Sequence, residues 1–239
     1  MLKTIWWFIY FWLYMFSTIP ALIKVKKLDR AKRFQEKDKI VHEEAKKWAK
    51  RIVQLTGSTV QVSGEEHIPK EGAVLFVSNH QGNFDIPVLI GYIDKPKAFI
   101  SKIEIKKLPL IGSWMQVMNC IFMDRKDLRQ QLRAINEGVE LLKKGYSLVI
   151  FPEGTRSKSD QMNRFKPGSL KLAIKTGVPI VPVTIKGTYK IMENNRFGFL
   201  LKPAHVEVVI SPAIYTNAYE KIDINELAHQ LEETIAEHL

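Results

Sequence analysis

The chain has 239 residues, enough for one well-packed core with a small appendage. Its 46% hydrophobic content excludes wholesale disorder, and its single cysteine excludes both a disulfide framework and an all-cysteine metal site. The formal net charge of +11 at pH 7 indicates an anionic partner, for which a membrane surface and a nucleic acid are the two main classes.

The first predicted element is an apolar helix. Ile5 to Ile23 contains no charged residue in nineteen positions, and at 1.5 Å per residue it would be roughly 28 Å long, about the thickness of one hydrocarbon core. Its three tryptophans and two tyrosines favour the headgroup level. A helix that crosses the membrane and one that lies in its plane are therefore both admissible, and a buried core helix is the remaining alternative.

A second helix, basic and amphipathic, is predicted from Lys24 to Leu55. Its apolar residues recur at spacings near three and four, opposite a charged face. Lys24 to Arg51 holds twelve basic and five acidic residues, an excess of seven charges that makes up most of the net charge. A basic stripe beside an apolar segment suits an anionic membrane surface. The sequence has no recognition-helix, finger or aromatic RNA-binding pattern, so we expect no nucleic acid partner.

These two helices predict a membrane-binding appendage at residues 1–55 and a main domain at residues 56–239. Short β-rich runs alternate with helical runs after a turn cluster at Thr56-Gly57-Ser58. Strands are predicted at Thr59–Val62, Ala73–Ser78, Ala98–Ser101, Cys120–Met123, Leu148–Phe151, Ile180–Ile185 and Val206–Ile210. Helices are predicted before Gly145, over Leu170–Thr176 and after a cap at Asp223. The alternation predicts an α/β fold in which helices flank a mostly parallel central sheet.

One candidate for catalysis follows the second predicted strand, in Asn79-His80-Gln81-Gly82-Asn83-Phe84-Asp85. Five residues turn about 500° around a helix, so His80 and Asp85 would not share a helical face. They meet if Gly82 and Asn83 form a turn and Asp85 begins the next helix. Asp85 would then orient the imidazole as a general base. The spacing alone is common by chance, and two such residues are too few for a metal site.

A second candidate site follows the fifth predicted strand, in Phe151-Pro152-Glu153-Gly154-Thr155-Arg156-Ser157. Gly154 permits close backbone approach, and the guanidinium of Arg156 can donate two hydrogen bonds to one phosphate. Glu153 has two interpretations, because it could orient the arginine or accept a hydrogen bond from a glycerol. A solvated charged turn is the alternative for the whole segment. In an α/β sheet, both motifs would lie at carboxyl ends of strands, where ligand sites gather.

Together the two motifs resemble the glycerolipid acyltransferases, and most of all the 1-acyl-glycerol-3-phosphate acyltransferases. Two further segments are similar to the family's second and fourth motifs, Ile121-Phe122-Met123-Asp124-Arg125 and Ile180-Val181-Pro182-Val183-Thr184-Ile185. All four motifs occur in family order, and the likeness covers about residues 56–210. The resemblance implies that His80 and Asp85 are catalytic. It also implies a set of substrate-binding residues, namely Lys102, Arg125, Glu153, Gly154, Thr155, Arg156 and Lys166. For Lys102 and Lys166, solvated side chains are the alternative.

The resemblance implies transfer of an acyl group from acyl-coenzyme A or acyl-carrier protein to the sn-2 hydroxyl of 1-acyl-glycerol 3-phosphate. The product would be phosphatidic acid, made at the cytoplasmic face of the cell membrane. Neither a metal nor a cofactor nor a covalent acyl-enzyme is implied. Two alternatives stay open. One is an acyltransferase for another acceptor, such as glycerol 3-phosphate or another lysolipid. The other is a non-catalytic basic lipid-binding protein, against which the intact pair of His80 and Asp85 argues.

Overall fold

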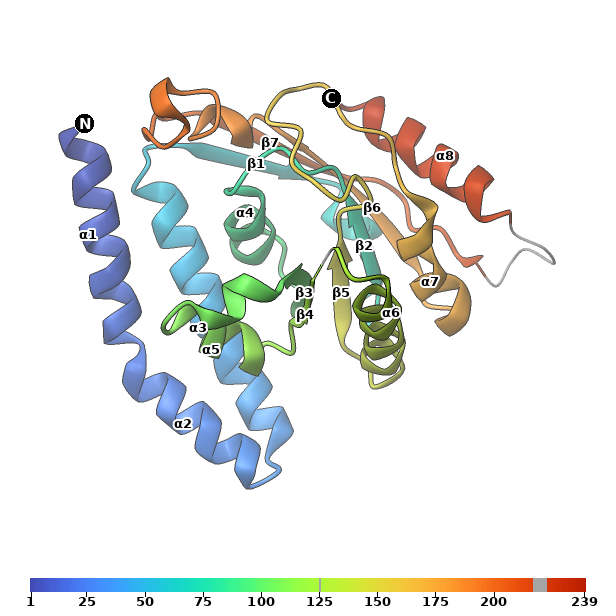
Figure 1. Cartoon of the computed structure of the whole chain (residues 1–239), viewed down its shortest axis with the longest axis horizontal. Coiled ribbons are helices and arrows are strands. Elements are labelled where there is room, and N and C mark those ends of the chain that lie inside the picture. The colour runs from blue at the N-terminus through green and yellow to red at the C-terminus, as the bar shows by residue number, and fades with distance from the viewer. Residues whose placement is uncertain (125, 217–222) are drawn as a thin grey trace.

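A computed structural model describes residues 1–124, 126–216 and 223–239 (Figure 1). Within them, seven strands form one sheet in the order β1-β7-β6-β2-β5-β3-β4. The strands are β1 (Thr59–Ser63), β2 (Leu75–Ser78), β3 (Lys97–Lys102), β4 (Ile121–Met123), β5 (Ser147–Ile150), β6 (Ile180–Lys186) and β7 (His205–Ile210). Neighbouring strands run parallel except β6 and β7, which run antiparallel. The predicted α/β class is confirmed, and each predicted strand is found within two residues of its expected bounds.

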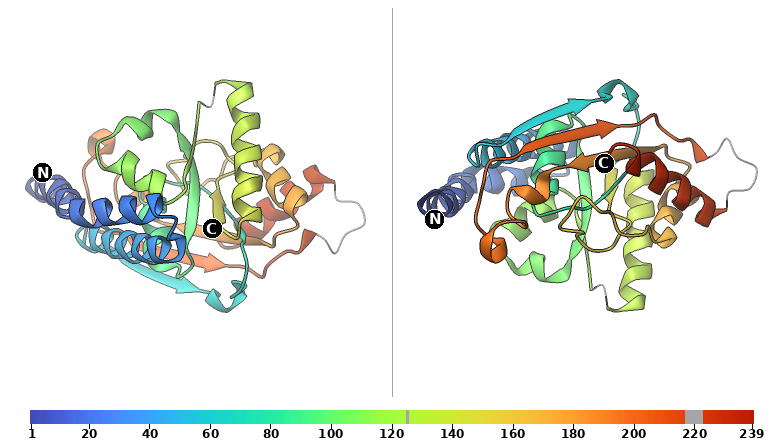
Figure 2. Two further views of the ribbon diagram at one scale, coloured as in Figure 1. Left: turned by 90° about the horizontal axis from the view of Figure 1, so that it is seen from below. Right: turned by 90° about the horizontal axis from the view of Figure 1, so that it is seen from above.

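Helices cover both faces of this sheet. The α-helices are α1 (Leu2–Ser17), α2 (Ile19–Arg30), α3 (Phe34–Gln54), α4 (Asp85–Tyr92), α5 (Ile111–Val117), α6 (Leu128–Lys143), α7 (Lys171–Thr176) and α8 (Ile224–Ala236). Short 3-10 helices are η1 (Glu65–His67), η2 (Ile103–Lys107), η3 (Pro167–Leu170), η4 (Thr188–Lys190) and η5 (Arg196–Gly198). Phe76 packs into the core shared with α3 and α4, whereas its neighbours Leu75 and Val77 pack into the core shared with α6, α7 and α8. Figure 2 shows these two helical groups on opposite sides of the sheet. Burial on both faces explains why the strands are apolar throughout.

The sheet topology brings the two motifs together. β2 and β5 are parallel neighbours, with Val77 paired to Ile150. Their carboxyl ends therefore lie at the same edge of the sheet, directly before His80 and before Glu153. Parallel strands place the segments that follow them side by side, which is why sites in such sheets gather at this edge.

The first predicted helix is wrong in its extent. Ile5 to Ile23 is not one helix, because α1 ends at Ser17 and α2 begins at Ile19, with a bend of 41° between them. Pro20 explains the break, since it has no N–H to donate to the preceding turn and its ring clashes with the carbonyl four residues earlier. The hydroxyl of Thr18 donates to the carbonyl of Met15 at 2.7 Å and satisfies part of the helix end.

The second predicted helix is also divided. α2 ends at Arg30, Lys32 adopts a left-handed φ of 56°, and α3 begins at Phe34. The amino-terminal segment therefore has three helices where two were predicted. The inner face of α3 contributes Ala49 and Ile52 to the core that it shares with α4. By packing, α3 thus belongs with the main domain, where it lies against α4, and the domain boundary between residues 55 and 56 stays a prediction.

The outer face of α1 is apolar and exposed. Its inner face is fixed to the core, where Trp7 Nε1 donates to the carbonyl of Ile52 at 2.8 Å. The exposed large apolar residues of α1 are Leu2, Ile5, Trp6, Phe8, Ile9, Trp12, Leu13 and Phe16. By length and composition, no individual helix among the described residues could cross a membrane, whereas the bent pair of α1 and α2 passes that test.

Candidate active site

The site is centred on a histidine and an aspartate from the first motif. His80 lies in the turn after β2, and Asp85 is the first residue of α4. Nδ1 of His80 lies 2.6 Å from Oδ2 of Asp85. A carboxylate only accepts hydrogen bonds, so Nδ1 carries a proton, and in the neutral form of the ring Nε2 then has a free lone pair. The predicted turn, the start of the next helix and the meeting of the two side chains are all found.

The carboxylate of Asp85 is fully buried, and both of its oxygens are satisfied. Oδ2 also accepts from the backbone N–H of Gly82 at 2.9 Å, and Oδ1 accepts from the hydroxyl of Thr188. A buried carboxylate needs such donors, because leaving one of its oxygens unpaired costs about 1–3 kcal/mol or more. Thr188 comes from η4, more than one hundred residues away, and no pattern in the sequence predicts its contact with Asp85.

The ring of His80 has a fixed orientation. It stacks on Phe151 with ring centroids 4.1 Å apart and planes 19° from parallel. Its backbone is held as well, because the His80 N–H donates to Glu153 Oε1 at 2.6 Å and the Ser157 N–H donates to the His80 carbonyl at 2.8 Å. Residues of the second motif therefore hold both the ring and the backbone of His80 in place.

Glu153 joins three segments of the site. Its Oε1 accepts from His80, and its Oε2 accepts from both the backbone N–H and the side-chain amide of Asn163 at 2.8 Å. Burial raises the pKa of this carboxyl above its ordinary value, while these hydrogen bonds act in the opposite direction. The two interpretations of Glu153 in the sequence were that it orients Arg156 or accepts a hydrogen bond from a glycerol, and neither included a contact with His80. The observed contacts favour a positioning role, and its substrate contact stays a prediction.

The rest of the second motif turns toward a cavity. Gly154 has a left-handed φ of 74°, and a Cβ at this position would lie 3.4 Å from Nζ of Lys166. Thr155 and Arg156 line the cavity. Nη1 of Arg156 donates to Oδ1 of Asn83 and, at 3.4 Å, to Oε1 of Glu193.

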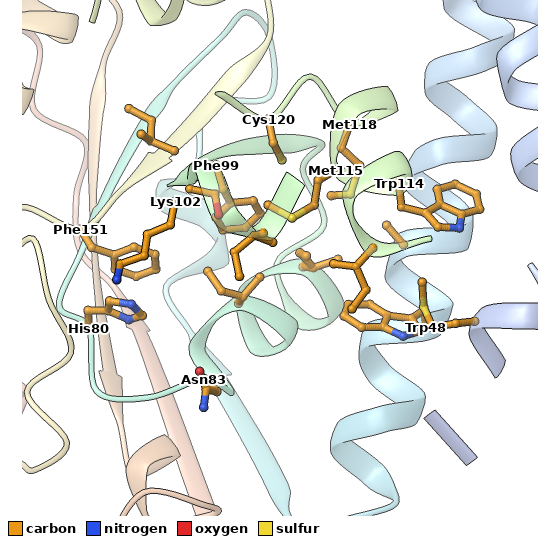
Figure 3. A pocket seen from close by; sticks show the side chains of 18 of the residues that line it. Trp48, His80, Asn83, Phe99, Lys102, Trp114, Met115, Met118, Cys120 and Phe151 are labelled. Atoms are coloured by element: carbon orange, nitrogen blue, oxygen red, sulfur yellow. The ribbon is translucent and has the colours of Figure 1, made fainter. Parts of the chain in front are cut away.

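Lys102 lies at the carboxyl end of β3, and its exposed side chain lines the same cavity. Figure 3 shows it close to His80 and Phe151. The structure thus brings together His80, Lys102 and Arg156. Arg125, predicted to bind the phosphate, lies outside the described residues. The substrate contacts of all these residues stay predictions.

An apolar cavity of about 390 Å³ extends from His80 between α4 and α5 toward the amino-terminal helices (Figure 3). His80, Phe151 and Lys102 lie at one end, and Trp48 and Trp114 lie at the other. The cavity has mainly apolar walls between these ends, formed by Ile86, Ile90, Phe99, Ile105, Ile111, Met115, Met118 and Cys120. Glu44 also lines the cavity, one helical turn from Trp48. A cavity with basic groups at one end and mainly apolar walls is suited to a molecule with an anionic head and a hydrocarbon chain.

Four contributors to the site were not singled out from the sequence: Phe151, Asn163, Thr188 and Glu193. Phe151 stands inside the second motif and was open to prediction. Thr188 and Glu193 follow β6 with no pattern of their own. Across residues 1–124, 126–216 and 223–239, no three His, Cys, Asp or Glu side chains are grouped so that they could hold a metal ion.

The chain is similar to known acyltransferases. Residues 59–186 match the family model Acyltransferase. A chloroplast 1-acyl-sn-glycerol-3-phosphate acyltransferase, BAT2 of Brassica napus, is 39% identical over 178 residues, which cover 74% of this chain and 51% of the relative. A probable 1-acyl-sn-glycerol-3-phosphate acyltransferase of Mycoplasma genitalium is 34% identical over 193 residues, which cover 77% of this chain and 71% of the relative. The chain thus spans about half the length of the plant relative and about seven tenths of the bacterial one.

Among solved structures, the 1-acyl-sn-glycerophosphate (LPA) acyltransferase PlsC of Thermotoga maritima matches with a TM-score of 0.86. The two chains are 33% identical, and the match covers 99% of this chain and 93% of the other. The likeness therefore includes the amino-terminal helices as well as the sheet. On these grounds, the chain belongs to the family of 1-acyl-sn-glycerol-3-phosphate acyltransferases.

Proposed function

We propose that this protein transfers an acyl group from a thioester, acyl-coenzyme A or acyl-carrier protein, to the sn-2 hydroxyl of 1-acyl-glycerol 3-phosphate and so forms phosphatidic acid. The observation that carries the proposal is the position of the pair formed by His80 and Asp85, at the charged end of a long apolar cavity. One end of that cavity supplies a base and cations, and the rest accepts hydrocarbon.

In the proposed reaction, Nε2 of His80 accepts the proton of the sn-2 hydroxyl as the oxygen attacks the thioester carbonyl carbon. A C–O bond forms, the C–S bond breaks, and the proton passes to the leaving thiolate. Asp85 keeps Nδ1 protonated and stabilises the imidazolium while it exists. Such general base catalysis contributes about 10²–10⁴-fold. Since the acceptor hydroxyl attacks the thioester directly, no acyl-enzyme forms.

The phosphate of the acceptor is assigned to the cationic end of the cavity. Arg156 and Lys102 line it, and the side chain of Lys166, from the segment after the second motif, lies beside Gly154. Arginine binds phosphate through two parallel hydrogen bonds, and lysine binds it as a point charge. A contact with Arg125, and with the backbone and hydroxyl of Gly154 and Thr155, completes the proposed set. Glu153 acts in it by holding His80.

The amino-terminal helices are assigned to the membrane. The exposed face of α1 gathers eight large apolar side chains, and a contiguous exposed apolar patch marks a surface that contacts a membrane or another protein. Many of the basic residues lie directly after it, in α2 and the start of α3. An apolar face and a positive charge are the two signals that together give stable attachment to an anionic surface. The cytoplasmic face of the cell membrane is proposed, because the acyl donors are cytoplasmic. The division into an attachment segment and a catalytic domain at residues 55 and 56 belongs to this proposal.

An acceptor panel tests the proposal. The purified protein is given one acyl thioester and, separately, 1-acyl-glycerol 3-phosphate, glycerol 3-phosphate and a lysolipid without an exposed phosphate. We expect the first acceptor to give the highest kcat/KM. A preference for glycerol 3-phosphate would mean that the enzyme catalyses the preceding acylation, which forms 1-acyl-glycerol 3-phosphate. The panel is run with acyl-coenzyme A and again with acyl-carrier protein as the donor. If no acceptor gave a product with either donor, the protein would be a lipid-binding protein without catalytic activity, and the proposal would be overturned.

A further inference from the structure

Glu193 occupies an unusual place for a carboxylate. It lies after η4, and its side chain is only 4% exposed. Oε1 accepts from the backbone N–H of Asn83 at 2.7 Å, and Arg156 donates to the same oxygen. Oε2 is buried and has no hydrogen-bond partner among the described residues. Burial raises the pKa of Glu193, and the nearby guanidinium of Arg156 opposes that rise.

The turn between His80 and Asp85 is shaped around this carboxylate. A Cβ at Gly82 would lie 2.5 Å from Oε2 of Glu193, a distance that Cβ atoms do not tolerate. Any larger residue at position 82 would therefore push the Glu193 carboxylate out of its observed position or open the turn. The neighbouring Asn83 contacts both partners, because its N–H donates to Glu193 and its Oδ1 accepts from Arg156.

Arg156 is thus held on one side. Its Nη1 donates to Asn83 and Glu193, while Nε and Nη2 have no protein partner among the described residues. The guanidinium lines the cavity and is 37% exposed on its side chain. The N–H groups of Nε and Nη2 lie on one edge of the guanidinium and can donate two parallel hydrogen bonds to two oxygens of one phosphate. A flexible arginine would have to be ordered on binding, at a cost of roughly 0.5–1.5 kcal/mol for such a side chain.

We propose that Glu193 is a positioning residue that acts through Arg156: it holds Nη1 against the turn at Asn83 and so orients the opposite edge of the guanidinium for the phosphate of the acceptor. The inference rests on the proposed function, in which Arg156 binds that phosphate. Glu193 itself touches neither the acceptor nor the reacting atoms. Its effect belongs to acceptor binding, whereas His80 and Asp85 act on the chemical step.

The first test is the division between KM and kcat. Glu193→Ala should raise KM for 1-acyl-glycerol 3-phosphate by about tenfold, within the range for losing a charge-assisted hydrogen bond, and should change kcat by less than about threefold. Glu193→Gln keeps an oxygen acceptor and should retain nearly normal KM. Glu193→Met fills nearly the same volume without offering an acceptor. It should raise KM as expected for Glu193→Ala, and it serves as the test if the alanine variant folds poorly. A fall in kcat with KM unchanged would overturn the inference.

Asp223 provides a control for the loss of a carboxylate that supports the backbone away from the site. Its Oδ1 accepts from the backbone N–H of Asn225 at 2.7 Å at the start of α8. Asp223→Asn and Asp223→Ala should leave KM for the acceptor unchanged. A rise in KM like that of the Glu193 variants would mean that backbone support in general, and no specific action on Arg156, explains the effect.

The double variant decides whether Glu193 acts through Arg156. Two residues that act through one contact are not additive. Glu193→Ala in a chain that already carries Arg156→Ala should therefore raise KM no further, within about twofold. Full additivity of the two changes would overturn the inference.

A spectroscopic measurement separates this inference from the proposed function. The Nε–H signal of Arg156, identified by its loss in Arg156→Ala, reports the order of the guanidinium without substrate. In the wild type this signal should be that of an ordered side chain. In Glu193→Ala it should be that of a guanidinium exchanging among several orientations. Normal KM in Arg156→Ala would overturn the phosphate assignment and with it the effect of Glu193 on acceptor binding, even if the Arg156 signal still showed that Glu193 orders the guanidinium. An unchanged Arg156 signal in Glu193→Ala would overturn the role of Glu193, whatever the kinetics.

Discussion

Nδ1 of His80 and Oδ2 of Asp85 lie 2.6 Å apart, although these residues would not share the face of a helix. The contact exists because the chain turns between them and the N–H of Gly82 donates to the same carboxylate oxygen at 2.9 Å. The turn is compact, and it leaves space on its far side for Glu193. The geometry of the proposed catalytic pair is therefore a property of the turn as a whole.

Asp85→Asn should lower kcat by at least about 10²-fold while KM changes little, because an amide no longer fixes the tautomer of His80 or stabilises the imidazolium. Steady-state kinetics with saturating donor measure the change. The protein contains a control pair on its surface, His42 and Asp94, with Nε2 and Oδ1 3.0 Å apart. Asp94→Asn should retain wild-type kcat. Equal losses in the two variants would mean that the Asp85 effect is not catalytic.

Gly82→Ala should reduce activity at least about tenfold, since the added methyl group must displace Glu193 or open the turn that holds Asp85, and a shift of about 1 Å at a reacting group costs up to 10²-fold. Gly168→Ala is the matched control, because a Cβ there meets no atom within 4 Å. It should keep normal activity. A normal rate for Gly82→Ala would show that the turn adapts and that Glu193 is not closely packed against it.

The seven strands were predictable because each is a local pattern, a short apolar run bounded by turn residues. The helix before Gly145 and the cap at Asp223 were local signals too, and the carboxylate of Asp223 does accept from the N–H of Asn225 at 2.7 Å. α5, with seven residues, was missed because its helical form depends on packing of Trp114 and Val117 against the amino-terminal helices. Such packing does not appear in any local window of sequence.

The errors in the amino-terminal segment have two different causes. Pro20 is a recognised helix breaker and could have predicted the end of α1. The uncharged length of residues 5–23 favoured one continuous helix instead. The break after α2 depends on the left-handed backbone conformation of Lys32. Lysine adopts this conformation only occasionally, so the residue type does not predict the break. In the site, His80 and Asp85 were predictable from their spacing and the turn between them. Glu193 was not, because it meets Asn83 across 110 residues of sequence.

Lys97 gives the protein a predicted pH dependence. Its ammonium is buried and donates to the carbonyls of Leu89 and Ile93 at the end of α4. Burial lowers the pKa of Lys97 from 10.5 to about 7. Between these values the unfolded chain holds a proton that the folded chain has released, so this group makes the free energy of unfolding rise with pH, by at most about 1.4 kcal/mol per pH unit. Below pH 7 both states are protonated and its contribution is flat.

Lys97→Met isolates this contribution, because every other titrating group is shared by the two proteins. The free energy of unfolding in urea is measured for both from pH 6 to 10. The difference, wild type minus variant, should be level near pH 6 and should then rise with pH. A level or falling difference across that range would mean that Lys97 titrates at its ordinary value.

Membrane attachment should depend chiefly on the outer face of α1. Removing residues before 56 would also remove α3 from the core, so point variants are the cleaner test. Replacing Ile9, Trp12, Leu13 and Phe16 with glutamine should abolish flotation with anionic liposomes. Replacing the basic residues of α2 with glutamine should weaken flotation mainly at low salt, because each contributes about 1 kcal/mol and is screened.

The control for the apolar change lies on α6, where Leu128 and Leu132 are also exposed. Glutamine at these two positions should leave flotation unchanged. Persistent binding by the α1 variant, or its loss in the α6 variant, would place the membrane surface on another face of the protein.

The most direct measurement compares the wild type with His80→Ala in the transfer of an acyl group from a thioester to 1-acyl-glycerol 3-phosphate, both proteins purified and shown by thermal unfolding to be folded. The wild type should form phosphatidic acid, and His80→Ala should turn over at least about 10²-fold more slowly with a similar KM, as loss of a general base requires. Turnover by folded His80→Ala close to that of the wild type would contradict the mechanism.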